Sequence, residues 1–415
     1  MRQLLKNIII NNQQRIASIE VRPRNISFDP SRNYVIIGPR RAGKSYILFQ
    51  QIQKYMQAGD SDRILYINFE DERLVGMNSA DLQLIIEAYR ELFDQKPILF
   101  FDEIQNIINW ELFCRRLADE NYQLFVTGSN AAMLSKEISA SLGGRFSSHE
   151  VNPLRFSESL EFQGIQLEEH WQYGRTAFKV KNRFNDYLHL GGFPERFQVN
   201  DAPDYLSTLY RKVIYGDVLL RYQIKNKRAL EILVKKMAES VNSETSFTRI
   251  RNLLAATGLK IGVHTVIDYL EHFQESYLIK TVSNAAKKFV EREIKKKYYF
   301  ADTGILNLFL FEQDTKLFEN AVFNELNHRS SQPVFYYKQN YEIDFFLPEQ
   351  RELIQVSYQL SDESTEKREV SALNKAMKYL DVSEAIIVTL DNEKDIMLDS
   401  GKRIRVIPAW KWFIQ

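Results

Sequence analysis

The sequence predicts an α/β protein built on a parallel sheet with helices on both faces, and three stretches indicate this class. A β-branched run at 34–37 is followed by the glycine-containing stretch 38–45 and a helical pattern. The apolar run 97–101 ends in two acids, and the run 123–126 ends in polar residues. Strands that alternate with helices form parallel sheets, whose ligand crevice lies at the carboxyl ends of the strands.

The stretch 38–45 reads GPRRAGKS and fits the phosphate-binding pattern G-x-x-x-x-G-K-[ST] at every fixed position. A strand, a glycine turn and a helix start place backbone N–H groups and a helix dipole around a phosphate. We expect Lys44 to reach the β- and γ-phosphates and Ser45 to take a Mg²⁺ position. The residues expected to bind the nucleotide here are Gly38, Pro39, Arg40, Arg41, Ala42, Gly43, Lys44 and Ser45.

The second strong signal is the strand that ends in Asp102 and Glu103. At the tip of such a strand, Asp102 is expected to hold the water shell of Mg²⁺. Glu103, one residue further on, is expected to polarise the attacking water as a general base. Acids often end strands, so this signal depends on the phosphate loop that lies 58 residues earlier at Lys44.

Two further side chains are candidates for the same site. Asn130 or Ser129, which follow the strand 123–126, is expected to contact a phosphate oxygen, with Asn130 the better amide partner; a helix cap is the alternative role. Arg145 follows two glycines and is expected to offset charge on the transferring phosphate, as an arginine finger does; an ordinary salt bridge is the alternative.

Composition limits the remaining possibilities. A chain of 415 residues is expected to form two to four domains. Its 55 Lys and Arg balance 54 Asp and Glu, so overall charge favours no partner. The single cysteine, Cys114, excludes a disulfide framework and a multi-cysteine zinc site. Neither a signal peptide nor a transmembrane run is recognisable, which predicts a cytoplasmic protein without a membrane role.

Beyond the first domain, at 1–150, the pattern changes. Residues 151–237 have mainly helical spacing and predict a lid, with the GGFP turn that ends at Pro194 either over the nucleotide base or in a simple loop. Residues 238–300 predict helix, turn, helix and a basic ribbon, the layout of a winged helix-turn-helix. The ribbon could follow DNA phosphates through Lys287, Lys288, Arg292, Lys295, Lys296 and Lys297, but the second helix offers few side chains to read bases.

Residues 301–415 predict an α/β domain with strands at 342–347 and 352–358 joined as a hairpin. Glu319 on a helix and Asp344 on this hairpin are arranged as in metal-dependent nucleases. The third element there is Gln355-Val356-Ser357. A glutamine is a poor ligand for a hard cation, and serine supplies no ammonium group. The sequence therefore predicts a degenerate nuclease-like site.

Taken in order, these motifs resemble the AAA+-type ATPases of bacteria and archaea (the STAND-like branch) that carry a C-terminal restriction-endonuclease-like domain. The matching stretches are GPRRAGKS (38–45), LFFDEIQ (99–105), VTGSN (126–130), LGGR (142–145), PLRFSE (153–158), GGFPE (191–195), IYGDVLLRY (214–222), YFADTG (299–304), FENAVFNEL (318–326) and EIDFF (342–346). The resemblance implies ATP and Mg²⁺ as cofactors and Walker B roles for Asp102 and Glu103. It also implies Asn130 as sensor, Arg145 near the γ-phosphate and Pro194 near the base. The family has Glu-Val-Lys where this chain has Gln355-Val356-Ser357.

The function expected from the sequence is Mg²⁺-dependent ATP binding and slow hydrolysis that drives a conformational switch. Three alternatives stay open: an ATP-regulated DNA-binding protein acting through residues 238–300, a weak nuclease, and a nucleotide-bound scaffold without turnover. Expected partners are ATP and ADP, DNA, and a protein partner or further copies of the chain.

Overall fold

The computed structural model divides the chain into two compact units, Met1–Asn152 and Pro153–Gln415. It describes residues 1–134, 136–330, 332–360 and 362–415. The first unit ends close to residue 150, where the sequence predicts the end of the nucleotide-binding domain. Apart from residues 151 and 152, the three later predicted segments lie within the second unit.

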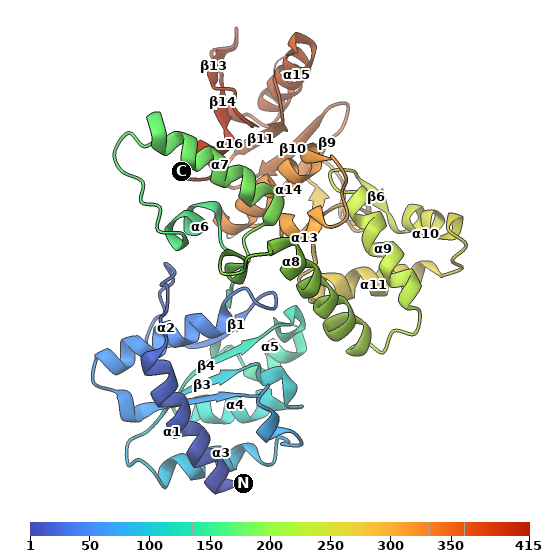
Figure 1. Cartoon of the computed structure of the whole chain (residues 1–415). Coiled ribbons are helices and arrows are strands. Elements are labelled where there is room, and N and C mark those ends of the chain that lie inside the picture. The colour runs from blue at the N-terminus through green and yellow to red at the C-terminus, as the bar shows by residue number, and fades with distance from the viewer. Residues whose placement is uncertain (135, 331, 361) are drawn as a thin grey trace. The chain divides into compact units, whose positions relative to one another are not determined.

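The first unit carries a five-stranded sheet in the order β2-β3-β4-β1-β5, and every strand pair is parallel. This confirms the predicted parallel sheet. Its elements are α1 (Arg2–Ser18), β1 (Asn33–Ile37), α2 (Lys44–Gln57), β2 (Ile64–Asn68), α3 (Leu82–Arg90), β3 (Ile98–Asp102), α4 (Trp110–Asp119), β4 (Gln123–Gly128), α5 (Lys136–Leu142) and β5 (Phe146–Glu150) (Figure 1).

Hydrophobic packing explains why the central strands are apolar throughout. Phe100 of β3 and Phe125 of β4 stack with ring centroids 5.0 Å apart, and Ile47 and Ile52 of α2 belong to the same cluster. Residues on the other face, such as Phe101, are equally buried. Since both faces are covered, alternation of polar and apolar residues is lost along these strands.

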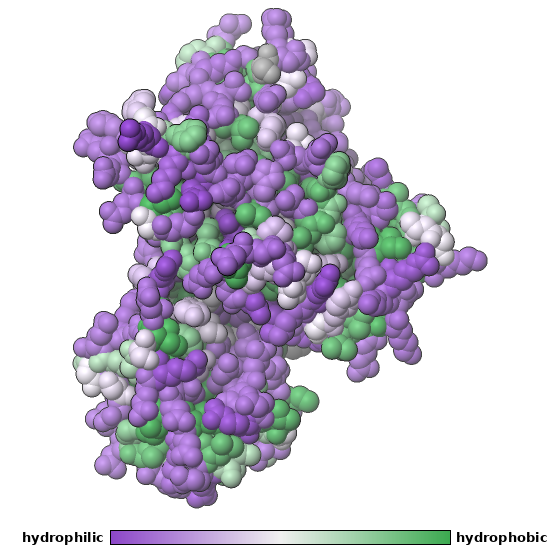
Figure 2. Space-filling view, in the orientation of Figure 1, coloured by the Kyte–Doolittle hydropathy of each residue, from purple (hydrophilic) through white to green (hydrophobic). Residues whose placement is uncertain are grey.

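The second unit begins with helices. These are α6 (Phe156–Phe162), α7 (Gly174–Leu190), α8 (Ala202–Arg211), a π-helix (Lys212–Leu220), α9 (Lys227–Glu239), α10 (Phe247–Ala256) and α11 (Val263–Glu275). The remaining helices are α12 (Phe289–Ile294), α13 (Thr303–Asn307), α14 (Asp314–Arg329), α15 (Glu363–Tyr379) and α16 (Ala409–Trp412). The face seen in Figure 2 is mostly hydrophilic, with hydrophobic residues in small separate groups.

One nine-stranded sheet runs through the second unit in the order β13-β14-β12-β11-β10-β9-β7-β8-β6. The strands are β6 (Thr245–Ser246), β7 (Ile279–Asn284), β8 (Lys295–Phe300), β9 (Phe335–Lys338), β10 (Glu342–Leu347), β11 (Glu352–Ser357), β12 (Glu384–Thr389), β13 (Lys394–Met397) and β14 (Arg403–Pro408). The predicted hairpin of β10 and β11 is present and antiparallel. The hairpin of β7 and β8 joins the same sheet through a parallel pairing of β7 with β9.

Helices cover both faces of the C-terminal strands. Leu373 and Met377 of α15 pack with Ile343 and Leu353 in one cluster. Phe318 of α14 belongs to the cluster on the other face. These strands are therefore covered on both faces, as the apolar run 385–388 of β12 indicates.

The GGFP turn is fixed by a buried acid. Asp302 accepts a 2.7 Å hydrogen bond from the Gly192 backbone N–H and also accepts from the N–H groups of Gly304 and Ile305 at the start of α13. Gly191 has a φ of 69°, and a Cβ there would lie 2.0 Å from the Asp302 carboxylate. This contact joins the stretches GGFPE and YFADTG in the fold.

Candidate nucleotide site

The parallel sheet of the first unit brings three predicted stretches to one edge. β4 lies between β1 and β3, with Ile37 opposite Gly128 and Phe101 opposite Val126. The loop 38–45 follows β1, the acids end β3, and Asn130 comes just after β4. These stretches meet because parallel strands all end at the same edge of a sheet.

Two glycines allow the phosphate-loop backbone to turn. Gly38 has a φ of 147°, and a Cβ at that position would lie 2.0 Å from the carbonyl oxygen of Val151. Gly43 has a φ of 98° and caps the N-terminus of α2. Both φ angles lie in the region that favours glycine, so the pattern's two fixed glycines have a conformational reason. Lys44 and Ser45 are then the first residues of a 14-residue helix.

Lys44 is folded back onto its own loop. Its Nζ donates hydrogen bonds of 3.1 Å to the carbonyl oxygens of Gly38 and Pro39 and lies 3.6 Å from the Glu103 carboxylate. The side chain is only 4% exposed. Burial lowers the pKa of Lys44, and the carboxylates of Glu103 and Asp102 oppose this shift only in part. An anion that reached the loop would therefore meet a desolvated ammonium group.

Asp102 is fully buried at the end of β3 and accepts hydrogen bonds from neighbouring hydroxyl groups. Tyr66 of β2 donates a 2.7 Å hydrogen bond to Oδ2, and Thr127 of β4 donates to Oδ1. Burial raises the pKa of Asp102, and the charge of Glu103 adds to this. Hydrogen bonds from Thr127, Ser45 and Tyr66 act in the opposite direction.

Glu103 lies 3.6 Å from Lys44, and its backbone is in the left-handed conformation, with a φ of 52°. Its N–H donates a 3.0 Å hydrogen bond to Thr127 Oγ1, and Gln105 Nε2 donates a 2.6 Å hydrogen bond to its Oε2. Burial favours a higher pKa for Glu103, but the positive charge of Lys44 and the Gln105 hydrogen bond outweigh it and lower the pKa. The carboxylate is thus kept ionised, as a general base requires.

Sequence reasoning missed Tyr66, Gln105 and Thr127 as supporting residues. Gln105 also lies within 3.4 Å of the Ser129 hydroxyl, so it links the acidic strand to the polar end of β4. Gln105 and Thr127 lie in stretches that were quoted above, LFFDEIQ and VTGSN. Tyr66 had no local signal, because its contact with Asp102 spans 36 residues.

Arg145 lies at the opposite edge of this sheet. It immediately precedes β5, whose first residue, Phe146, is opposite Asn33 at the start of β1. Its guanidinium is paired with Asp119 and donates to the Gly143 carbonyl oxygen. The structure therefore does not bring Arg145 to the phosphate loop of its own chain. Arg40 of the loop pairs with Glu70 at 3.0 Å.

The donor set at the edge fits a magnesium ion. Mg²⁺ prefers oxygen ligands and is usually held by one or two protein carboxylates or hydroxyls together with water and substrate phosphates. The Ser45 hydroxyl and the Asp102 carboxylate provide that set, and the hydroxyls of Tyr66 and Thr127 orient the carboxylate.

In the second unit, the structure brings Glu319, Asp344 and Gln355 together. The Gln355 amide oxygen accepts a 3.3 Å hydrogen bond from the Asp344 backbone N–H. Lys297 is 1% exposed and lies among the acids, which corrects its predicted place on an exposed basic ribbon: β8 turns this side chain inward while Lys295 stays exposed. Burial and the charge of Glu319 raise the pKa of Asp344 to about 8.

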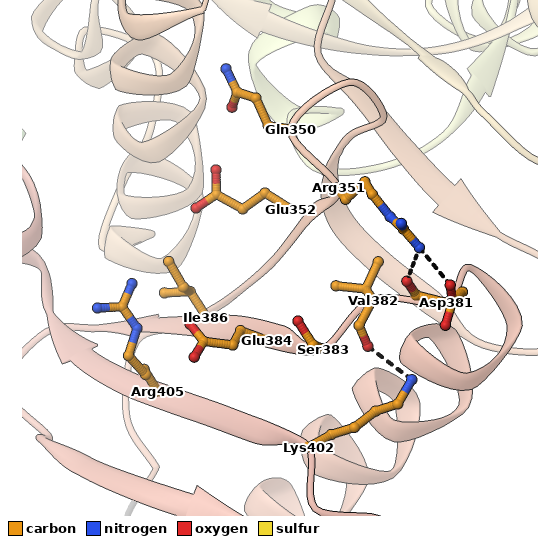
Figure 3. Close-up of a pocket in the computed structure, with 10 residues that line it drawn as sticks. All are labelled: Gln350, Arg351, Glu352, Asp381, Val382, Ser383, Glu384, Ile386, Lys402 and Arg405. Atoms are coloured by element: carbon orange, nitrogen blue, oxygen red, sulfur yellow. Dashed lines mark hydrogen bonds and ion pairs between the residues drawn. The ribbon is translucent and has the colours of Figure 1, made fainter.

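A separate cavity of about 550 Å³ lies where β11, β12 and β14 begin. Figure 3 shows Arg351 paired with Asp381 and Lys402 donating to the Val382 carbonyl oxygen. Three basic and three acidic side chains line it, so the cavity favours neither anions nor cations.

Among the described residues, no helix has the length and apolar character needed to cross a bilayer.

Comparison with known proteins agrees with this geometry. Residues 30–160 match the model of a family described as AAA domain, and residues 181–316 match a domain of unknown function, DUF8612. The chain is 34% identical to the uncharacterized protein MJ1544 of Methanocaldococcus jannaschii over 424 residues, covering 99% of this chain and 95% of that protein. The chain belongs to the family of MJ1544.

Another relative is an uncharacterized protein of Haemophilus influenzae, 25% identical over 92% of this chain and 94% of its own length. Among solved structures, the Walker-type ATPase PABY2304 of Pyrococcus abyssi shares 16% identity, with a TM-score of 0.41 over 71% of this chain and 99% of its own. The AAA-domain match and the parallel sheet support a P-loop ATPase-type domain in this member of the MJ1544 family.

Proposed function

We propose that this protein binds ATP with Mg²⁺ and hydrolyses it slowly, and that the cycle acts as a conformational switch. The observation that carries the proposal is the position of Lys44 between the loop carbonyls and the Glu103 carboxylate, next to buried Asp102. Phosphate binding would replace the two carbonyl contacts of Lys44 with phosphate contacts. Nucleotide binding would thereby change the interactions of both the loop and Glu103.

Each residue of the edge has a role in this proposal. Ser45 and Asp102 would hold Mg²⁺, which offsets phosphate charge when bound. Glu103, oriented by Thr127 and Gln105, would polarise the attacking water. Asn130, just beyond β4, would read the γ-phosphate.

Slow turnover follows from the position of Arg145. An arginine that offsets charge on the transferring phosphate contributes about 10³–10⁵ in rate in related phosphoryl-transfer enzymes. Because Arg145 lies at the other edge of its own sheet, it could serve only the site of a neighbouring copy. We therefore expect ATP turnover to rise with protein concentration if copies assemble.

The experiment is a paired measurement of ATP-dependent thermal stabilisation and phosphate release on the full chain, with and without duplex DNA. Stabilisation together with slow release supports the switch. Stabilisation without release, alone or with DNA, would instead favour a nucleotide-bound scaffold. The absence of any stabilisation by Mg²⁺-ATP would contradict the proposal.

A second candidate function is duplex DNA binding through residues 238–300, and the β7–β8 hairpin favours it. Between these strands, α12 exposes Phe289 (77%) and Val290 (66%), flanked by exposed Lys288 and Lys295. Apolar side chains beside cations are what minor-groove proteins insert between base steps. The order of α10, α11, β7 and β8 supports this function, because the sequence predicts helix, turn, helix and ribbon in this stretch.

Salt dependence tests this second function. Replacing both Lys288 and Lys295 by alanine should lower the slope of log affinity against log salt by about 2, since each phosphate contact contributes about 0.9. The matched control replaces Lys367 of α15 and Lys394 of β13 by alanine, because both lysines lie elsewhere in the second unit. If duplex DNA is not retained at low salt, this function is excluded.

A further inference from the structure

The second unit contains a buried ammonium group enclosed by three carboxylates. Lys297 of β8 places its Nζ 2.9 Å from Glu342, 3.5 Å from Glu319 and 3.7 Å from Asp344. The acids come from β10 and α14, so three elements meet at one side chain. Because Lys297 is 1% exposed, the ammonium has exchanged water for these carboxylates.

The three carboxylates have further partners: Tyr299 reaches the same Glu319 oxygen as Lys297, whereas the second oxygens of Asp344 and Glu342 are engaged separately. Tyr299 donates a 2.7 Å hydrogen bond to Glu319, and the Val356 N–H donates a 2.9 Å hydrogen bond to Asp344 Oδ2. Lys338 pairs with the second oxygen of Glu342 at 2.6 Å. Each acid is therefore fixed in an orientation that directs one oxygen toward the Lys297 ammonium.

This arrangement leaves little room for a divalent cation. A metal among Glu319 and Asp344 would need oxygens about 2.0–2.6 Å from its centre. The ammonium already lies within 4 Å of both carboxylates, and moving it away would leave buried charges uncompensated. Gln355 is engaged with the Asp344 backbone. Across the described residues, no group of three or more His, Cys, Asp or Glu is arranged to hold a metal ion.

We propose that Lys297 is the resident cation of this cluster and that its ammonium keeps divalent metal out of the space among Glu319, Glu342 and Asp344. The nuclease-like centre is then a structural ion-pair site. This site joins strand β8, which follows α12 in the β7–β8 hairpin, to helix α14 and strand β10. Asn284 reinforces the join, because its side chain donates to and accepts from the Lys338 backbone.

The test is Mn²⁺ binding to the full chain without nucleotide, followed by electron paramagnetic resonance. The wild-type protein and Asp344→Asn should bind equal amounts of Mn²⁺, because the cluster contributes no site. Lys297→Ala should add one Mn²⁺ site. Mn²⁺ should bind this site at least about tenfold more tightly than it binds the wild-type protein, because the carboxylates around Lys297 are freed. Lys297→Ala combined with Asp344→Asn should lose that gain, and Lys296→Ala, one residue away, should behave as wild type.

Two outcomes would overturn the proposal. One is Mn²⁺ bound by the wild-type protein and lost in Asp344→Asn, which would show that the metal enters despite Lys297. The other is a folded Lys297→Ala protein with no added site. If Lys297→Ala does not fold, the proposal is still tested by comparing the Mn²⁺ bound by the wild type and by Asp344→Asn. Mn²⁺-dependent nicking of plasmid DNA by these two proteins is the second measurement. Nicking by the wild type that Asp344→Asn abolishes would refute the proposal as well.

Discussion

The Lys44 ammonium and the Glu103 carboxylate lie 3.6 Å apart at the end of the first sheet, although 59 residues separate them in the chain. Both side chains are buried, and Gln105 holds the second oxygen of Glu103. Phosphate would compete with Glu103 for the same ammonium group. Nucleotide binding should thus release the carboxylate that activates water.

Replacing Glu103 by glutamine should preserve nucleotide binding and reduce phosphate release by about 10²–10⁴, since the amide cannot act as a base. The check is phosphate release together with the affinity for a fluorescent ATP analogue. Glu120→Gln, an exposed acid beyond α4, serves as the control and should turn over normally. Unchanged release in Glu103→Gln would remove the assigned role.

Replacing Lys44 by alanine should abolish stabilisation by ATP. A ligand at 100 times its Kd raises the free energy of unfolding by about 2.7 kcal/mol, and this gain should be missing in the variant. Thermal unfolding with and without Mg²⁺-ATP measures it. Lys54→Ala removes an exposed lysine from the same helix and should keep the full gain. Equal stabilisation of both variants would show that ATP binds elsewhere.

The acid that holds the GGFP turn should give the protein a distinctive pH dependence. Burial raises the pKa of Asp302 from 3.8 to about 6. The protonated form is therefore favoured by folding, and its stabilising contribution is complete below pH 3.8 and lost as the pH rises through about 6. A shift of roughly two pKa units corresponds to about 3 kcal/mol.

Asp302→Asn should flatten this part of the stability curve, which urea unfolding between pH 4 and 7 would measure. The asparagine amide will not replace all the backbone hydrogen bonds, which lowers stability at every pH. The informative quantity is therefore the slope of the free energy of unfolding against pH. Asp201→Asn, at the exposed cap of α8, should retain the wild-type slope. Parallel curves for wild type and Asp302→Asn would contradict the prediction.

Glu325 should be among the most costly charges to remove in the second unit. It is 1% exposed at its side chain and pairs with Arg155 and Arg329. Glu325→Ala should cost about 2 kcal/mol. This is less than the ~3–5 kcal/mol typical of fully buried pairs, because both arginines are partly exposed. Arg183→Ala, which breaks an exposed pair with Asp186, should cost under about 1 kcal/mol in the same urea titration.

Local patterns were sufficient for the phosphate loop and for the acidic strand. Gly38, Gly43 and Lys44 are neighbours in the chain, and their chemistry depends on one turn. The supporting side chains could not be found in this way, because Tyr66 and Thr127 reach Asp102 across 36 and 25 residues. Their role depends on strand order, which hydrophobic patterns do not determine.

Arg145 and Lys297 show the same limit from different causes. The sequence indicates a flexible arginine before a strand, but the parallel direction of β5 places that arginine at the far edge. Lys297 belongs to a run of three lysines that looks solvent-facing, and only the pairing of β8 in the sheet reveals that its side chain turns inward.

The strands of the nine-stranded sheet differ in how many residue pairs join them to their neighbours. β7 and β9 share only the pairs Ser283–Phe335 and Asn284–Tyr336, whereas β12 and β14 share six pairs. If strain were applied across the sheet, the pairing of β7 with β9 would be among the first to open, because only two residue pairs span it, as for β6 with β8. Asn284 and the Lys297 cluster lie beside the pairing of β7 with β9. Without them, the β7–β8 hairpin would separate from the C-terminal strands, while the parts on either side kept their own folds.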